Sequence, residues 1–278
     1  MVSGKQVDVR VSTLPTAYGE SVSMRLLLKD SKFIKLDELG FNPEGIKIIR
    51  EAISKPHGII FNTGPTGSGK TTTLYAILSE LNKPSVKIVT LEDPIEYRIK
   101  GVDQSQIEPE AGYTFATGLR SVLRQDPNII MVGEIRDADT ATTAINAAMT
   151  GHLVLTTLHT NNAPSSIPRL LDMGVKPYLL GGTINLIIAQ RLVRMICQNC
   201  HGKGCEVCNQ SGFKGRTVVA ELLVPTKEIE DLINKGASVR EFEEAAKKAG
   251  MISMLEDGMK KVAAGITTKE ENDRVTRE

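Results

Sequence analysis

The stretch Gly64-Pro65-Thr66-Gly67-Ser68-Gly69-Lys70-Thr71 decides the fold of this chain, because it fits the pattern G-x-x-x-x-G-K-[ST]. In such a loop the glycines let successive backbone N–H groups curl around phosphate oxygens, and the following helix points its positive end at them. Lys70 then reaches the β- and γ-phosphates, and the Thr71 hydroxyl holds Mg²⁺. The pattern predicts that residues Gly64 through Thr72 bind ATP with Mg²⁺. The alternative is a glycine-rich turn that happens to contain a lysine.

Length and charge limit the kind of protein this can be. A chain of 278 residues with 41% hydrophobic content can bury one α/β core and carry small appendages. Its formal net charge of +1 creates no overall field that favours nucleic acid or an anionic membrane. The N-terminal region lacks an export-signal pattern, and glycine and polar residues interrupt the longest apolar stretch, Leu179 to Ala189. We therefore expect a cytoplasmic protein.

All four cysteines lie close together, as Cys197, Cys200, Cys205 and Cys208. Two C-x₂-C pairs at this spacing let four thiolates close a tetrahedral Zn²⁺ site. In a chain without an export signal such a cluster favours a metal site over disulfides. A pair of disulfides and an iron–sulfur cluster are the alternatives.

Hydrophobic periodicity predicts the order of strands and helices. Residues 7–28 alternate polar and apolar side chains around a turn at Pro15 to Gly19, which indicates a β-hairpin. Asn42 and Pro43 supply the first positions of a helix that stops before Pro56. The pattern then alternates between strand and helix, as in a mostly parallel sheet covered on both faces. We expect strands over 58–62, 86–90, 128–132, 152–157 and 218–224, and helices after the glycine-rich loop to residue 81, over 117–125 and over 138–149.

The residues after the last predicted strand are expected to be helical. Capping boxes are predicted at Ser238/Glu241 and Thr268/Glu271, and Gly250 is predicted to stop a helix. These signals indicate a small helical subdomain at the C-terminal end.

Carboxylates follow two of the predicted strands. Glu92 lies where an apolar strand runs into the proline turn Asp93-Pro94, and Glu134 ends the strand that begins at Asn128. Gly133 stands where many P-loop enzymes carry an aspartate that organises the metal ion, so we expect Glu92 to take this role. Taken alone, an acidic residue beside an Asp-Pro turn is also compatible with a solvated loop.

Two histidines, His152 and His159, lie at the two ends of a third strand. Nucleotides bind at the carboxyl ends of parallel strands, so we expect these imidazoles and the two carboxylates to converge on the phosphates. A lone histidine near a strand end is also compatible with a purely structural group.

The chain resembles the secretion ATPases of type II secretion and type IV pilus assembly, a branch of the RecA-like hexameric P-loop motors. Four family boxes occur in order and the resemblance covers nearly the whole chain. They are a Walker A motif at Gly64–Thr71, an Asp box at Leu91–Tyr97, a Walker B motif ending Gly133-Glu134-Ile135-Arg136-Asp137, and a His box at Gly151–Thr160. The glycine before the Walker B glutamate is usual in this family.

The resemblance implies a role for each residue of the boxes. Glu134 is the expected catalytic carboxylate, which polarises the attacking water, and Glu92 is expected to help organise metal and water. His152 and His159 are expected to sense the terminal phosphate, and Lys70 is expected to act on the transferred phosphate.

The opening hairpin resembles the end of the family's second N-terminal domain, so we expect the chain to start inside that domain. The resemblance implies that Arg10 and Arg25 reach nucleotide across a subunit or domain interface, as arginine fingers do. Ordinary ion pairs at a strand edge are the alternative for both residues.

The resemblance also favours zinc as the metal of the four cysteines. Secretion and pilus-extension members of the family carry a tetracysteine element, followed by a stretch similar to Gly212-Phe213-Lys214-Gly215-Arg216, whereas retraction-type members lack it. The linker between the two cysteine pairs is shorter here than in many of these relatives.

The expected fold is α/β, with a RecA-like P-loop core, a partial β-rich N-terminal domain, a small zinc knuckle and a helical C-terminal subdomain. The expected boundaries are 1–38 for the partial N-terminal domain and linker, 39–196 for the ATPase core, 197–217 for the zinc element, and 218–278 for the last core strand and the helices.

The resemblance implies an ATP-hydrolysing motor that drives pilin or pseudopilin assembly. The expected partners are further copies of the chain in a hexameric ring and an inner-membrane platform protein, which would hold the motor at the membrane peripherally. A RecA-like nucleic-acid translocase is an alternative, although the near-neutral charge and 4% aromatic content argue against strand binding. A nucleotide-gated scaffold without turnover is a second alternative.

Overall fold

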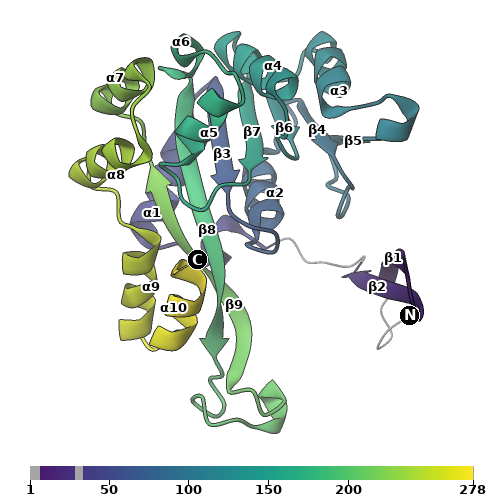
Figure 1. Cartoon of the computed structure of the whole chain (residues 1–278), viewed down its shortest axis with the longest axis vertical. Coiled ribbons are helices and arrows are strands. Elements are labelled where there is room, and N and C mark those ends of the chain that lie inside the picture. Colours follow the sequence, from purple (N-terminus) through teal and green to yellow (C-terminus); the bar gives the residue numbers. More distant parts are fainter. Residues whose placement is uncertain (1–6, 29–33, 278) are drawn as a thin grey trace.

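The computed structural model, which describes residues 7–28 and 34–277, has an α/β fold around a seven-stranded sheet (Figure 1). The strand order is β5-β4-β6-β7-β3-β8-β9. All neighbours run parallel except β9, which is antiparallel to β8. The strands are β3 (Gly58–Thr63), β4 (Ile88–Glu92), β5 (Asp103–Gln106), β6 (Ile129–Val132), β7 (Leu153–Leu158), β8 (Ile184–Ile196) and β9 (Phe213–Leu223).

Helices cover both faces of the sheet, because successive residues of each buried strand point to opposite faces. In β3, Ile59 and Phe61 belong to one hydrophobic core and Ile60 belongs to the other. The core of Ile60 is closed by α1 (Pro43–Ile53) and α2 (Lys70–Leu81). The core of Phe61 is built with α3 (Phe115–Val122), α4 (Ala138–Met149), α5 (Ser166–Asp172), α6 (Pro177–Leu180), α7 (Lys227–Lys235) and α8 (Val239–Lys248).

The mostly parallel sheet confirms the predicted fold class, and the predicted strands occur with ends shifted by a few residues. Two strands were not predicted. β8 is buried on both faces for most of its length, so it shows no alternation of polar and apolar residues. β5 is a short, polar and partly exposed edge strand, so hydrophobic periodicity could not find it.

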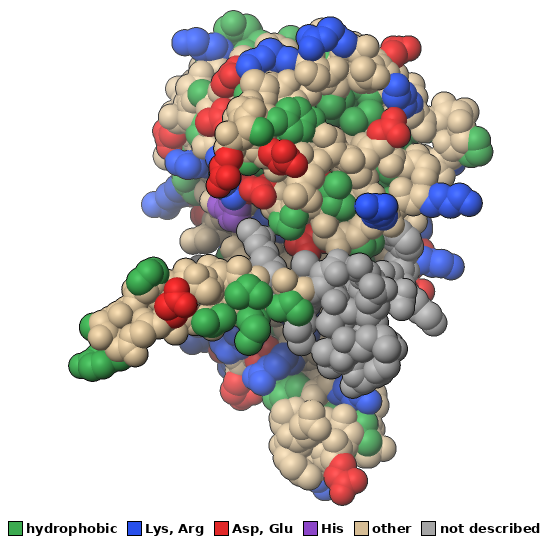
Figure 2. Space-filling view, turned by 90° about the vertical axis from the view of Figure 1, so that its right-hand side faces the viewer, with side chains coloured by type: hydrophobic (Ala, Val, Ile, Leu, Met, Phe, Trp, Pro, Cys, Tyr) green, Lys and Arg blue, Asp and Glu red, His purple; other side chains and the backbone are tan. Residues whose placement is uncertain are grey.

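The predicted N-terminal hairpin is present as β1 (Val7–Thr16) and β2 (Gly19–Leu28), a separate two-stranded sheet. Hydrophobic side chains such as Val11 and Met24, which face each other in register, are exposed on its surface (Figure 2). Arg10 and Arg25 are also cross-strand partners. Their side chains lie outside the described residues.

The part of the chain that the structure describes also contains four short 3₁₀ turns: η1 (Leu36–Glu38), η2 (Pro109–Ala111), η3 (Leu123–Gln125) and η4 (Glu206–Cys208). None of the helices within 7–28 and 34–277 combines the length and the apolarity needed to cross a bilayer.

The helix-capping predictions are partly right. Ser238 and Glu241 cap α8 reciprocally, as predicted. Thr268 accepts from the Glu271 backbone N–H at the start of α10 (Lys269–Thr276), but the Glu271 side chain does not return to Thr268. The prediction of a full box at this helix is wrong, because the carboxylate instead binds two arginines.

Glu271 joins α10 to strand β8. One oxygen accepts from the Arg194 backbone N–H at 3.0 Å and the other from the Arg194 guanidinium at 2.8 Å, while Arg274 binds the same carboxylate at 2.7 Å. Burial alone raises the pKa of this carboxyl, but the hydrogen bonds from Arg274 and Arg194 outweigh it and hold the pKa at about 2. The neighbouring helix α9 (Met254–Ala263) packs against β9 and α10.

We predict that Glu271→Gln lowers the free energy of unfolding by about 3 kcal/mol at pH 7, the value implied by a pKa that falls from 4.5 to about 2 on folding. Because the folded pKa is the lower one, this stabilisation is complete above pH 4.5 and disappears as the pH falls toward 2. Urea unfolding at several pH values measures it. Glu244→Gln, in the exposed pair with Arg240, is the control and should change stability by less than about 1 kcal/mol. Equal losses in both variants would contradict the prediction.

Candidate functional site

A cavity of about 650 Å³ opens at the carboxyl edge of the sheet. Its walls come from the loops that follow β3, β4, β6 and β7, which are neighbours in the sheet order. The cavity brings together Lys70, Glu92, Glu134 and His159, four of the side chains that the sequence predicted to converge.

The glycine-rich loop joins β3 to α2 on one side of this cavity. Gly67 and Gly69 have φ angles of 83° and 90°, a left-handed conformation that strains any residue with a Cβ. Gly69 is the N-cap of α2, so the first backbone N–H groups of this helix have no acceptor within the helix. The loop therefore offers converging N–H donors and a positive helix end, which together suit a phosphate group.

The Lys70 side chain folds back onto the first residues of the loop. Its Nζ donates to the carbonyl oxygens of Gly64 at 2.6 Å and Pro65 at 3.1 Å. Burial lowers the pKa of Lys70 to about 8, the Glu134 carboxylate opposes this effect, and the Arg191 guanidinium adds to it. The ammonium is thus a partly desolvated cation, whose attraction to an anionic ligand is stronger than in water.

Glu134 follows β6 and faces the cavity with 15% of its side chain exposed. Arg136 binds one of its oxygens at 2.6 Å, and Nε2 of His159 lies 3.4 Å from the other. The Thr157 hydroxyl donates to the Gly133 carbonyl at 2.7 Å and so fixes the turn that carries Glu134. A carboxylate in this position can accept a proton from a water molecule in the cavity.

Glu92 ends β4 and is almost completely buried. Its carboxylate accepts from the hydroxyls of Tyr75 and Thr90 and, at 3.0 Å, from the Gln104 amide. Burial and the Glu92 charge both raise the pKa of Tyr75. Sequence reasoning missed these partners. Thr90 lies in β4 itself, whereas Tyr75 comes from α2 and Gln104 from the unpredicted strand β5, although a tyrosine inside an apolar helix is a detectable signal.

The structure does not bring His152 to this cavity. His152 precedes β7 and His159 follows it, and a strand of 6 residues separates its ends by about 20 Å. Nδ1 of His152 lies 3.0 Å from the Ala147 carbonyl, and His152 is absent from the cavity wall. The expectation that both histidines face the phosphates is corrected for His152, because the two ends of one strand lie at opposite edges of the sheet.

Sequence reasoning also missed part of the cavity wall. Leu192 of β8 and Arg216 of β9 line the cavity together with Ile34 and Leu74. Leu192 and Arg216 lie far from the glycine-rich loop in the sequence, and the pairing of β8 with β3 and of β9 with β8 brings them to it.

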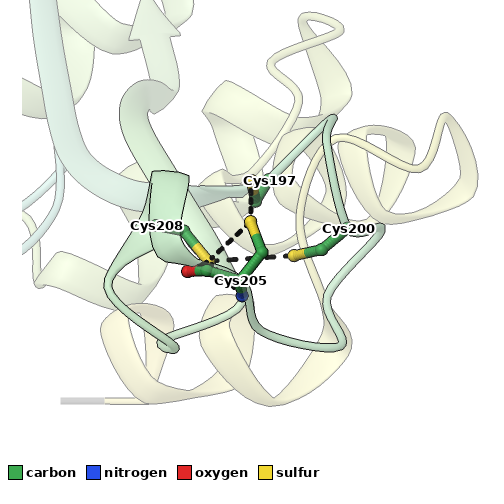
Figure 3. A group of neighbouring side chains, drawn as sticks. All are labelled: Cys197, Cys200, Cys205 and Cys208. Atoms are coloured by element: carbon green, nitrogen blue, oxygen red, sulfur yellow. Dashed lines mark hydrogen bonds between the residues drawn. The ribbon is translucent and has the colours of Figure 1, made fainter.

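The four cysteines lie at the tip of the long β8–β9 ribbon, where the chain makes two tight turns (Figure 1). Their sulfur atoms point toward one another (Figure 3), and all lie within 4.8 Å of each other. Three of the sulfur pairs, Cys197 with Cys205, Cys200 with Cys208, and Cys205 with Cys208, are 3.9, 3.7 and 3.7 Å apart.

These distances argue against disulfides among the four cysteines. A disulfide requires sulfurs about 2.05 Å apart, and all four cysteines are free. Four thiolates at about 2.3 Å from one Zn²⁺ ion lie about 3.8 Å from each other at the corners of a tetrahedron. The observed separations therefore fit a closed tetrahedral metal site.

Comparison with known proteins identifies the family. Residues 1–274 match the family model described as Type II/IV secretion system protein. The chain belongs to this family. The resemblance inferred from the four sequence boxes is thereby confirmed.

Individual members of the Type II/IV secretion system family show how close the relation is. Type II secretion system protein HxcR of Pseudomonas aeruginosa is 50% identical over the whole of this chain, and Type IV pilus assembly ATPase PilB of Thermus thermophilus is 46% identical over 95% of it. The chain spans 61% of the first relative and 33% of the second. A solved structure of the pilus retraction motor PilT with bound ADP has a TM-score of 0.75 and 30% identity, covering 97% of this chain and 78% of that one.

We predict that Tyr75→Phe lowers the free energy of unfolding by about 1–3 kcal/mol, because the buried Glu92 carboxylate loses one of its donors. Urea unfolding of the variant and the wild type measures the change. Tyr18→Phe, which removes a hydroxyl from a fully exposed ring, is the control and should fall within about 0.5 kcal/mol of the wild type. A loss for Tyr75→Phe no larger than that of the control would show that the Glu92 contact does not stabilise the fold.

Proposed function

We propose that this chain is the catalytic core of an ATPase that drives assembly of pilin-like subunits in type II secretion or type IV pilus biogenesis. The observation that carries the proposal is the meeting of Lys70, Glu134 and His159 around one cavity beside a phosphate-binding loop. Two relatives support it, since one is named for type II secretion and the other as a pilus assembly ATPase.

In this proposal each cavity residue acts on a different part of the reaction. The backbone N–H groups of Gly64 through Thr72 hold the phosphates, and Lys70 places its charge on the β- and γ-phosphates. Glu134 orients and deprotonates the attacking water, and His159, beside it at 3.4 Å, senses the terminal phosphate. Glu92 helps to organise metal and water at the cavity wall. Mg²⁺, which Thr71 would hold, supplies charge neutralisation on the phosphates.

Arg10 and Arg25 are proposed to complete the site from a neighbouring subunit or domain. The backbone pairing of β1 with β2 sets these two positions opposite each other in the hairpin. Each would stabilise charge that develops on the transferred phosphate.

The larger assembly is also part of the proposal. The core (39–196), the cysteine element (197–217), the C-terminal part (218–278) and the N-terminal part (1–38) would act as units within a hexameric ring. An inner-membrane platform protein would receive the motion of this ring and hold it at the cytoplasmic face of the membrane. The four cysteines would bind Zn²⁺ as a structural element.

We predict that Lys70→Ala lowers ATP turnover at least a hundredfold and weakens nucleotide binding, because the phosphates lose their partly buried cation. Glu134→Gln should lower turnover by a similar factor while nucleotide stays bound, because only the proton acceptor is lost. Phosphate release and equilibrium binding of a fluorescent nucleotide measure the two effects. Wild-type turnover in Glu134→Gln would favour a nucleotide-gated scaffold, and a large salt-sensitive stimulation by nucleic acid would favour a translocase.

The two histidines provide a matched pair of variants. We predict that His159→Ala lowers ATP turnover at least tenfold, because it removes the imidazole beside Glu134. His152→Ala should leave turnover within about twofold, because His152 lies at the opposite edge of the sheet. Steady-state phosphate release at saturating ATP measures both. Equal losses would show that distance from the cavity does not separate their roles.

We predict that the purified protein contains about one zinc ion per chain, since four sulfurs at these separations fit one tetrahedral ion. Cys205→Ser should reduce the zinc content to less than half, whereas Lys203→Ala, an exposed neighbour on the same loop, should leave it unchanged. Inductively coupled plasma mass spectrometry measures zinc and iron together. Iron in place of zinc, or far less than one metal ion per wild-type chain, would contradict the assignment.

A further inference from the structure

A glutamine side chain is fully buried beneath the phosphate loop. Gln190 lies in β8, one residue beyond the position where Ala189 pairs with Thr63, the last residue of β3. A buried amide is costly unless both its N–H and its C=O groups find partners. The contacts of Gln190 therefore indicate what this residue does.

Both ends of the Gln190 amide are paired. Nε2 donates to the Ser68 carbonyl at 2.8 Å, and Oε1 accepts from the Asn62 amide at 3.0 Å. Asn62 is itself fully buried, and its Nδ2 lies 3.4 Å from the Lys70 carbonyl. The pair thus ties the phosphate loop and the first turn of α2 to two central strands.

The contact with Ser68 fixes the direction of a peptide group. The Ser68–Gly69 peptide is trans, and in a trans peptide the carbonyl and the following N–H point in opposite directions. Because the Ser68 carbonyl points at Gln190 inside the protein, the Gly69 N–H points away from Gln190. A Cβ on Gly69 would lie 3.1 Å from Nε2 of Gln190, so the loop rests directly on this side chain.

We propose that Gln190 is a positioning residue of the nucleotide site, which orients the Gly69 N–H toward the phosphate without touching the nucleotide. The inference rests on the proposed function, because it assumes that the loop binds phosphate. It predicts a specific loss of phosphate affinity when the Gln190 donor is removed.

A matched control lies in the same strand. Asn185 is also buried, and its Nδ2 donates to the His57 carbonyl at 2.8 Å, just before β3 begins. The two amides therefore hold backbone carbonyls at opposite ends of β3. Gln190→Met and Asn185→Leu keep nearly the same side-chain volume. Each removes one contact with a backbone carbonyl, and Gln190→Met also removes the acceptor of the Asn62 amide.

The experiment measures MgADP binding by isothermal titration calorimetry and amide hydrogen exchange of residues 64–71 by mass spectrometry. Gln190→Met should weaken MgADP binding about 10- to 100-fold, the effect of losing one well-aligned hydrogen bond to a charged group. The same variant should exchange faster over 64–71. Asn185→Leu should bind MgADP within about twofold of the wild type and leave exchange over 64–71 unchanged, even where both variants lose similar thermal stability.

Three outcomes would overturn the inference. If Gln190→Met binds MgADP like the wild type while Lys70→Ala does not bind, Gln190 has no positioning role and the proposed function stands. If Asn185→Leu weakens binding as much as Gln190→Met, the loss reflects general destabilisation. If the wild-type chain itself does not bind MgADP, the proposed function is wrong and this inference is wrong with it.

Discussion

The structure depends on one constraint in the glycine-rich loop between β3 and α2. Several backbone N–H groups of this loop must point at the same small volume. Within the loop, the Ser68 N–H donates to the Pro65 carbonyl at 3.3 Å. Here the loop is fixed at both ends, by β3 before it and by α2 after it, and from below by β8. Strand β3 lies between β7 and β8, and both neighbours contribute side chains to the site.

Charged groups of both signs lie around this loop. Lys70 is partly desolvated, which lowers its pKa. The carboxylate of Glu134 raises the pKa of Lys70, and the guanidinium of Arg191 lowers it. Glu134 is in turn flanked by Arg136 and His159. The carboxylates of Glu92, Asp93, Glu96 and Glu134 line the same cavity as Lys70, His159 and Arg216. A chain of near-neutral net charge therefore carries charged groups of both signs around one cavity.

Much of the fold and site was predictable from the sequence, because the decisive signals are local. The glycine positions, the apolar strand runs and the N-cap at Asn42 each depend on neighbours in the chain, and the structure confirms them. What sequence reasoning missed depends on contacts between distant segments. β8 shows no periodicity because it is buried on both faces, and Glu271 binds Arg194 instead of its own helix end. His152 was misplaced because a motif gives order along the chain, whereas the length of β7 sets the distance across the sheet.

Strand β8 also has a mechanical consequence. The same strand contacts the glycine-rich loop through Gln190. Its Arg194 binds Glu271 of α10, and its last residue directly precedes Cys197. From Gln190 to Cys197 the backbone spans roughly 23 Å at about 3.3 Å per residue, with an irregularity in its pairing to β9 between Arg194 and Ile196. The cysteine tip and the C-terminal helices are therefore joined to the floor of the cavity through one strand, so a displacement of that strand would reach all three.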